Sequence, residues 1–319
     1  MEYYGETRSE YKSNMRSDRP IVAIGELLWD LLPTGTRAGG APFNFAFHCH
    51  QLGHRAIIVS RVGDDELGHK LRQEVRRLGL SDEFIQTDPI HPTGTVEVEI
   101  DNAGQPKYTV AMPVAWDRIE WTPGIDALAK DALAMCFGSL AQRSKRNRDL
   151  IAAFVAYTLE DCLTICDINF RRPFLTDEII EDSLRICDWL KVNEEEAESI
   201  AKTIAAVFDS PHPVSHAEWL LTRLMAAILN DRAICAITRG ANGCIVRNMD
   251  ATVELPGIPI TVADAVGAGD AFTAALLTQH LELKSLVQSA KFANAYAAVV
   301  ASKPGGTPTV TREEVEQLL

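Results

Sequence analysis

The sequence predicts an α/β protein, a three-layer α/β/α sandwich with a mostly parallel central sheet and a small β-sheet lid. Short apolar runs alternate with amphipathic helical patterns along most of the chain, which favours parallel βαβ units. One segment breaks this alternation with the polar–apolar pattern of a hairpin. Polar residues and glycines follow the apolar runs, where ligands of open α/β sheets bind.

The expected strands and helices alternate along the chain. Buried strands are expected at residues 21–24, 56–60, 134–137, 163–166, 189–192 and 233–237. Helices are expected at residues 43–52, 67–78, 148–159, 179–187 and 216–229. The residues expected just past strand ends, and so on one rim of the sheet, are Asp30, Gly138, Asp167, Asn193 and Gly240.

Residues 94–101 alternate polar and apolar side chains, residues 102–106 form a turn, and residues 107–110 return. This pattern predicts an antiparallel hairpin whose apolar face carries Val96, Val98 and Ile100. We expect lid segments at about 31–40 and 93–114, because a hairpin that projects from an α/β core can close over a ligand. Periodicity alone leaves an ordinary edge hairpin equally open.

Composition limits the classes of protein that this chain can be. The 319 residues are 46% hydrophobic and 24% charged, with a net charge of −13, and the acidic balance argues against a nucleic-acid binder. No apolar run has the length that a membrane span needs. Residues 1–19 are polar and predict a disordered tail before one domain at 20–319, and residues 143–148 predict a solvated helix start. Seven scattered cysteines indicate buried free thiols in a reducing cytoplasm.

The most informative segment is Asp264-Ala-Val-Gly-Ala-Gly-Asp270, which is followed by an apolar helical run. Its small residues permit a tight turn, so that the N–H groups of Gly267, Ala268 and Gly269 can point at an anion together with the start of the helix. Asp270 is placed to accept a proton from an attacking hydroxyl, which indicates phosphoryl transfer. The alternative is that Asp270 only caps the helix.

This block resembles the C-terminal signature of the ribokinase/PfkB family of carbohydrate kinases, usually Asp-Thr-x-Gly-Ala-Gly-Asp, with Ala265 in place of the threonine. Residues 38–44 match the family's N-terminal signature in the Gly-Gly-Ala-Pro-x-Asn form that resembles bacterial fructokinases. Residues 114–118 and 137–143 also look like that branch. The resemblance runs from about Ile21 to the C-terminus and implies a ribokinase-like fold.

The resemblance implies a sugar site on two loops and a strand end. Its residues would be Asp30, Gly39, Gly40, Asn44, Asn169 and Arg171. The carboxylate of Asp30 can accept hydrogen bonds from two hydroxyls, and the amide of Asn44 can both donate and accept. The alternatives are that Asn44 caps a helix and that Arg171 is an exposed loop residue.

The resemblance also implies a nucleotide and metal site. Its nucleotide residues would be Asn193, Thr238, Gly240, Gly243 and Asn294. Glu196 would hold Mg²⁺ through water, although a solvated acidic helix start explains it equally from the sequence. A monovalent cation such as K⁺ would bind around Asp264, Val266 and Gly305 through backbone carbonyls.

The implied activity is ATP-dependent transfer of the γ-phosphate to a primary hydroxyl of a free sugar, with fructose as the expected sugar. The alternatives are a kinase of the same family for 2-keto-3-deoxygluconate, ribose or a nucleoside, and a sugar-binding homologue without catalysis. We expect a cytoplasmic protein with no nucleic-acid or membrane partner. The apolar face of the hairpin predicts a homodimer formed through the lid.

Overall fold

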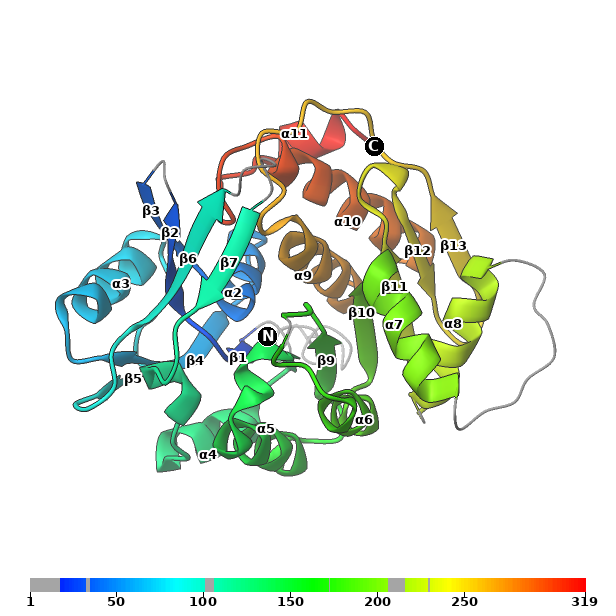
Figure 1. The fold of residues 1–319 in the computed structure, drawn as a ribbon. Coiled ribbons are helices and arrows are strands. Elements are labelled where there is room, and N and C mark those ends of the chain that lie inside the picture. The colour runs from blue at the N-terminus through cyan, green and yellow to red at the C-terminus, as the bar shows by residue number, and fades with distance from the viewer. Residues whose placement is uncertain (1–17, 33–34, 101–105, 172, 206–215, 229) are drawn as a thin grey trace, which may run out of the picture.

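The computed structural model describes residues 18–32, 35–100, 106–171, 173–205, 216–228 and 230–319. In these residues a nine-stranded sheet forms the centre of the molecule, in the order β13-β12-β11-β10-β9-β8-β1-β4-β5 (Figure 1). Its strands are β1 (Ile21–Ile24), β4 (Ala56–Gly63), β5 (Ile85–Asp88), β8 (Ala134–Gly138), β9 (Leu163–Asp167), β10 (Trp189–Asn193), β11 (Ile234–Thr238), β12 (Cys244–Arg247) and β13 (Thr252–Leu255).

The pairing is parallel from β5 through β11 and antiparallel only for β12 and β13. The mostly parallel sheet is therefore confirmed, and each of the six predicted strands is present. The antiparallel pair at the edge was not predicted, because its two runs are only four residues long. The carboxyl ends of β1, β9, β10 and β11 meet at one rim, as parallel pairing requires.

Helices cover both faces of the sheet and complete the predicted three layers. One layer contains α2 (Ala41–Gln51), α3 (Glu66–Arg77), α9 (Ala268–Leu281), α10 (Leu286–Ala301) and α11 (Arg312–Glu316). The other contains α4 (Pro123–Asp131), α5 (Lys145–Tyr157), α6 (Asp177–Ile186), α7 (Glu194–Ala205) and α8 (His216–Ala227). Successive side chains of β1 alternate between the layers, since Ala23 packs in the first and Val22 in the second.

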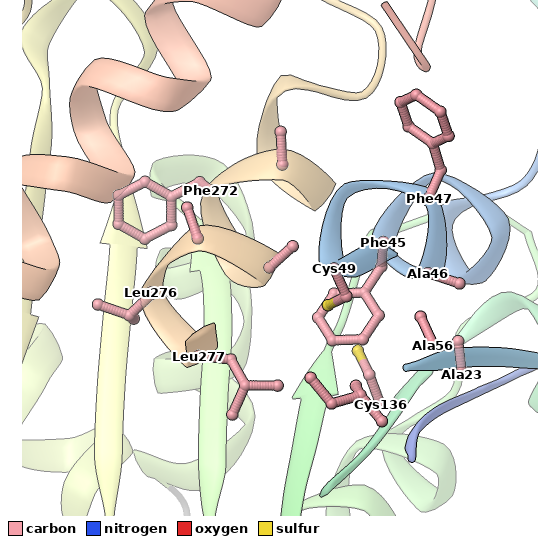
Figure 2. Close-up of a cluster of buried hydrophobic side chains, with 14 of the residues drawn as sticks. Ala23, Phe45, Ala46, Phe47, Cys49, Ala56, Cys136, Phe272, Leu276 and Leu277 are labelled. Atoms are coloured by element: carbon pink, nitrogen blue, oxygen red, sulfur yellow. The ribbon is translucent and has the colours of Figure 1, made fainter. Parts of the chain in front are cut away.

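The core between α2, α9 and the sheet fixes the start of α9 at the rim. Figure 2 shows Phe45 of α2 pointing towards Cys136 of β8, with Leu277 of α9 nearby. Eight consecutive residues of α9, from 271 to 278, are buried, so this helix is enclosed on all sides. Its N-terminus is consequently held in one position by packing.

A second sheet lies beside the first, with strand order β3-β2-β6-β7 (Figure 1). Its strands are β2 (Leu28–Leu32), β3 (Gly35–Gly39), β6 (Gly94–Ile100) and β7 (Pro106–Val110). The predicted hairpin is present, and its partner strands begin three residues before the expected segment, at Leu28. Residues 101–105 of the predicted turn lie outside the described residues.

Two other expectations concern the N-terminal tail and the helix start at residues 143–148. Residues 1–17 of the predicted tail lie outside the described part, whereas Arg19 donates to the carbonyl of Ala132 at 2.7 Å and so contacts the domain. The solvated start predicted at 143–148 is wrong for Arg143, which is buried, pairs with Asp117 at 2.7 Å and lies 4.0 Å above the Trp116 ring. Arg143 turns inward because it ends a short 3₁₀ turn before α5 begins.

All seven cysteines are free and buried, as the sequence predicts. Among the described residues, no helix is both long and apolar enough to cross a membrane.

Candidate active site

A cavity of about 1210 Å³ lies between the second sheet and the rim of the central sheet. Every site residue predicted from the sequence lines it except Gly39. Gly39 lies directly beneath the carboxylate of Asp30, where any side chain would collide with that group. The structure thus brings together residues that are up to 275 positions apart, 30 to 305, in one concave surface.

Asp270 lies in the first turn of α9, and Gly267 is the residue that caps this helix. The alternative in which Asp270 is the cap is therefore wrong. The side-chain amide of Asn44 donates from Nδ2 to Oδ2 of Asp270 at 2.8 Å. Asn44 lies in α2 beyond its cap Gly40, so the cap alternative fails for this residue too. The N-termini of two helices consequently meet at one carboxylate.

Burial, aided by the negative charge of Asp167, gives Asp270 a raised pKa of about 6. The positive charges of Lys191 and Arg171 and the hydrogen bond from Asn44 act in the opposite direction. At neutral pH Asp270 is mainly a carboxylate, and its pKa is closer to neutral pH than the pKa of an exposed aspartate. Such a group suits general-base chemistry.

The turn before Asp270 is built from residues without bulky side chains for a visible reason. Gly267 has φ 78°, in the left-handed region, and a Cβ there would lie 2.5 Å from Cα of Gly306. The Ala268 N–H makes a long bond, 3.4 Å, to the carbonyl of Ala265. That amide is partly engaged, so the predicted anion hole depends mainly on the amides of Gly267 and Gly269.

Lys191, which the sequence did not predict, extends the site by pairing with Asp167, a residue that was expected at the rim. Lys191 is buried in β10 and donates to Asp167 at 3.0 Å, and Thr273 donates to the other oxygen of Asp167 at 2.8 Å. A Cβ on Gly269 would lie 2.7 Å from Nζ of Lys191, so this ammonium borders the anion turn. Burial lowers the pKa of Lys191, but attraction to Asp167, Glu196 and Asp270 outweighs it and the net shift is upward. The sequence does carry a signal for this residue, because Lys191 is the one charged residue in the apolar run Trp189–Asn193.

Glu26 is the second group that was missed. It follows β1, is 3% exposed, lines the cavity, and its Oε2 has no hydrogen-bond partner. Burial raises its pKa to about 7, aided by repulsion from Asp270 and opposed by Arg171. The sequence analysis considered only Asp30 in this segment, although a glutamate between an apolar strand and two leucines was a usable signal.

Asp30 lies inside β2 of the second sheet, opposite Arg37 of β3 and Val96 of β6. The expectation that it follows a strand of the main sheet is therefore wrong, because the chain enters the lid at Leu28. Burial raises the pKa of Asp30 to about 6, with Asp264 adding to the rise and the arginines at 37 and 171 opposing it. This carboxylate faces the cavity from the lid side.

Asn169 and Arg171 follow β9 at the rim. Asn169 has φ 45°, a left-handed conformation that asparagine tolerates. Arg171 is exposed, donates to the carbonyl of Phe170 at 2.9 Å, and lines the cavity. It is an exposed loop residue, and its charge also acts on Glu26, Asp30 and Asp270.

The predicted nucleotide residues occupy the other end of the cavity, at the ends of β10 and β11. Gly240 and Gly243 have φ 53° and 86°, and a side chain on Gly243 would collide with the backbone of Leu255. Asn294 of α10 donates to the carbonyl of Pro256 at 3.0 Å, which fixes its side chain at the cavity wall. Thr238 ends β11 beside Asn193 of β10.

Glu196 is buried, so the alternative of a solvated helix start is wrong. Its two oxygens accept the N–H groups of Phe170 and Asn193, each at 2.7 Å. Each carboxylate oxygen keeps a further lone pair, and the side chain lines the cavity. These properties fit a Mg²⁺ ion held through water, whereas direct coordination by three acidic, histidine or cysteine groups has no cluster to support it among the described residues.

The three residues predicted to hold a monovalent cation are brought together around one carboxylate. Asp264 accepts the N–H of Val266 at 3.1 Å and that of Gly305 at 3.1 Å. It also accepts a hydrogen bond from Arg37 at 2.7 Å. Because three donors already use this carboxylate, a K⁺ ion here would depend on the backbone carbonyls of the turn, as the sequence predicts.

Comparison with known proteins places this geometry in context. The family model for pfkB family carbohydrate kinases matches residues 32–312. A putative sugar kinase of Pyrococcus horikoshii is 27% identical, with 92% of this chain and 94% of that protein covered. Fructokinase-1 of Zea mays is 29% identical, with 94% and 97% covered.

Solved structures share the fold. An uncharacterized sugar kinase of Pyrococcus horikoshii in complex with ATP matches with a TM-score of 0.77 at 26% identity, covering 94% of this chain and 100% of that chain. The fructokinase of Xylella fastidiosa with bound ATP matches with a TM-score of 0.80 at 22% identity, covering 94% and 98%.

Proposed function

Because the chain belongs to the pfkB family of carbohydrate kinases, we propose that it transfers the γ-phosphate of ATP to a primary hydroxyl of free fructose. The single observation that carries the reaction type is Asp270, buried at the start of α9 beside Asn44 and Lys191. The choice of fructose is supported by the fructokinases among the relatives. It is also supported by the Gly-Gly-Ala-Pro-x-Asn form of residues 39–44.

In this mechanism Asp270 accepts the proton of the attacking hydroxyl. A loose phosphoryl transition state needs little early proton removal, so a carboxylate with a pKa of about 6 is basic enough. The amides of Gly267 and Gly269 and the ammonium of Lys191 offset the charge that develops on the transferred group. Asn44 orients the base through its 2.8 Å hydrogen bond.

The acceptor sugar lies between Asp270 and the lid in this proposal. Asp30 accepts hydrogen bonds from two sugar hydroxyls, and Gly40 and Asn44 line the same cavity. Gly39 keeps the space beneath Asp30 clear, Asn169 contacts the sugar, and Arg171 contacts sugar or phosphate oxygens. Val96 and its neighbours form an apolar roof that excludes water and so suppresses ATP hydrolysis.

ATP, Mg²⁺ and K⁺ are the proposed cofactors. ATP lies along the second half of the cavity, between Thr238, Gly240, Gly243 and Asn294, with Asn193 near its phosphates. Glu196 would hold Mg²⁺ through water, and the turn formed by Asp264, Val266 and Gly305 would hold K⁺. Solved kinases of the same fold hold ATP with Mg²⁺, or fructose and ADP with K⁺.

A homodimer formed through the lid and a cytoplasmic location complete the proposal. The seven buried free cysteines support a reducing compartment.

The test is a coupled kinase assay with the purified protein, ATP and a panel of hexoses, pentoses, 2-keto-3-deoxygluconate and nucleosides. We expect fructose to give the highest kcat/KM. A higher kcat/KM for another member of the panel would identify that compound as the substrate and would keep the protein a kinase of the same family. If none of the acceptors increases the rate of ATP consumption, the result would instead favour the alternative of a non-catalytic sugar-binding homologue.

A further inference from the structure

Arg37 joins two parts of the site that are far apart in the chain. It lies in β3 of the lid, and its Nη1 donates to Oδ2 of Asp264 at 2.7 Å. Asp264 begins the turn that leads to the anion hole and Asp270. A lid strand is therefore tied directly to the segment that shapes the phosphate site, across 227 positions of sequence.

The carboxylate of Asp264 organises that segment. One oxygen accepts the N–H of Val266, and the other accepts the N–H of Gly305. The next residue, Gly306, packs against both Gly267 and the side-chain amide of Asn44. If Asp264 moves, Gly305 and Gly306 move with it, and Gly306 is in direct contact with Gly267 and Asn44. The displacement is therefore passed on mainly by the backbone.

Arg37 is also the cross-strand partner of Asp30, the carboxylate proposed to bind the sugar. Side chains directly opposite in an antiparallel pair lie on the same face of the sheet. The charge of Arg37 lowers the pKa of Asp30, and the charge of Asp264 raises it. The charge of one guanidinium thus acts on both the proposed sugar carboxylate and the carboxylate that shapes the anion turn.

The exposure of this ion pair indicates what it does. The side chains of Arg37 and Asp264 are 40% and 23% exposed. Ion pairs this accessible contribute little to the stability of a fold, because water and salt screen them. A sugar and a closed lid over the pair would remove water and strengthen the attraction. Its strength is therefore sensitive to whether the acceptor site is filled.

We propose that Arg37 is a positioning residue that couples sugar binding at the lid to the geometry of the anion turn, acting through Asp264. The inference rests on the proposed function. With a sugar on Asp30 the lid and Arg37 hold Asp264, and the turn at Gly267 binds the phosphates of ATP more tightly. By reciprocity, bound ATP tightens the binding of the sugar by the same factor.

The test measures this coupling factor in the full-length protein. The dissociation constant of a non-hydrolysable ATP analogue is determined by calorimetry with and without saturating fructose, at saturating KCl. If the panel assay identifies another acceptor, that sugar replaces fructose. For R37Q we expect the coupling factor to fall about three- to thirtyfold, as for other residues that link two sites, with kcat lowered and ATP affinity without sugar unchanged. R37K keeps the charge and should restore part of the coupling.

R232Q is the matched control. Arg232 also pairs with an aspartate, Asp188, at 2.9 Å and is 39% exposed, but it does not line the cavity. It should leave the coupling factor and kcat unchanged. An R37Q protein with an unchanged coupling factor, or with only the loss of melting temperature that R232Q also shows, overturns the inference.

A double-mutant cycle with D264N separates action through Asp264 from a direct effect on Asp30. The coupling factor of the double variant R37Q/D264N should equal that of D264N alone. If the two substitutions instead lower the coupling factor additively, Arg37 does not act through Asp264. If the unmodified protein phosphorylates no acceptor, the proposed function fails. If the unmodified protein phosphorylates an acceptor but the coupling factor of R37Q is unchanged, the proposed function stands and only the role of Arg37 fails.

Discussion

At the scale of single residues, the candidate site is marked by carboxylates whose pKa values are raised by burial. Asp270 was predicted from its place after Gly-Ala-Gly, and the structure adds the partners Asn44, Asp167 and Lys191. No sequence pattern names these partners together, because they come from α2, β9 and β10 and meet only through the fold. The same reason explains why Glu26 was overlooked, since its burial beneath the start of α2 depends on packing.

The pH dependence of activity follows from the pKa of Asp270. If Asp270 is the base, as proposed, it acts as a carboxylate; its pKa is raised to about 6, so activity should fall as the pH drops through about 6. An unperturbed aspartate would retain activity down to about pH 4. A plot of kcat against pH checks this; an acid limb below pH 5 would show that Asp270 is not the titrating group.

The variant Asp30→Ala should affect the sugar far more than ATP. It removes a carboxylate proposed to accept two hydroxyl bonds, so kcat/KM for the sugar should fall about tenfold to a hundredfold. The KM for ATP should stay within about twofold, since the proposed nucleotide site is built from the ends of β10 and β11 and not from the lid. Steady-state kinetics with each substrate varied in turn measure both, and an unchanged sugar KM with unchanged kcat would make Asp30 structural.

At the scale of elements, the predictions succeeded where a segment carries its own pattern. The apolar runs of β1, β4, β8, β9, β10 and β11 identify them as buried strands, and the alternation at residues 94–101 identifies the hairpin. The antiparallel pair of β12 and β13 was missed because its runs are four residues each and resemble loop sequence. The start of the lid at Leu28 was also missed, since Leu28 and Trp29 extend an apolar run without a visible break.

The turn at Gly267 offers a test with a close control. Gly267→Ala introduces strain at φ 78° and a collision with Gly306, so the turn must move and kcat should fall at least tenfold. Gly53→Ala introduces comparable strain at φ 91° but meets no atom within 4 Å. Each strained alanine should cost about 1–3 kcal/mol of folding free energy.

Thermal melts and kinetics of the two alanine variants separate stability from function. We expect a loss of melting temperature in both variants, larger in Gly267→Ala because of its collision with Gly306, and a loss of kcat only in Gly267→Ala. Equal kcat values for the two variants would remove the special role of the turn.

At the scale of the whole molecule, the sequence led to the correct fold class and one shared site. The two family signatures lie at the N-termini of α2 and α9, and these helices begin at the rim where β9, β10 and β11 end. The proposed dimer is less directly supported. Val96, from the apolar face that predicted it, packs against Leu28, Leu32 and Val110 within the chain and lines the cavity. The side chains of Val98 and Ile100 lie outside the described residues.

Light scattering at micromolar concentration tests the dimer. We expect about twice the mass of 35.1 kDa for the unmodified protein, and a shift towards the monomer with a higher sugar KM for Val98→Asp. Met249→Asp, at an exposed position between β12 and β13 at one edge of the central sheet, is the control and should keep the dimer. A monomeric unmodified protein would end the dimer proposal and leave the kinase proposal intact.

The most direct test of the account is ATP turnover by Asp270→Asn with and without fructose. The substitution keeps the fold, the anion turn and a hydrogen-bonding group beside Asn44, but removes the base. We expect normal ATP binding by calorimetry and a loss of kcat of about two to four orders of magnitude. An Asp270→Asn protein that binds ATP and still phosphorylates the sugar at near-normal rate would contradict the central claim that Asp270 is the catalytic base.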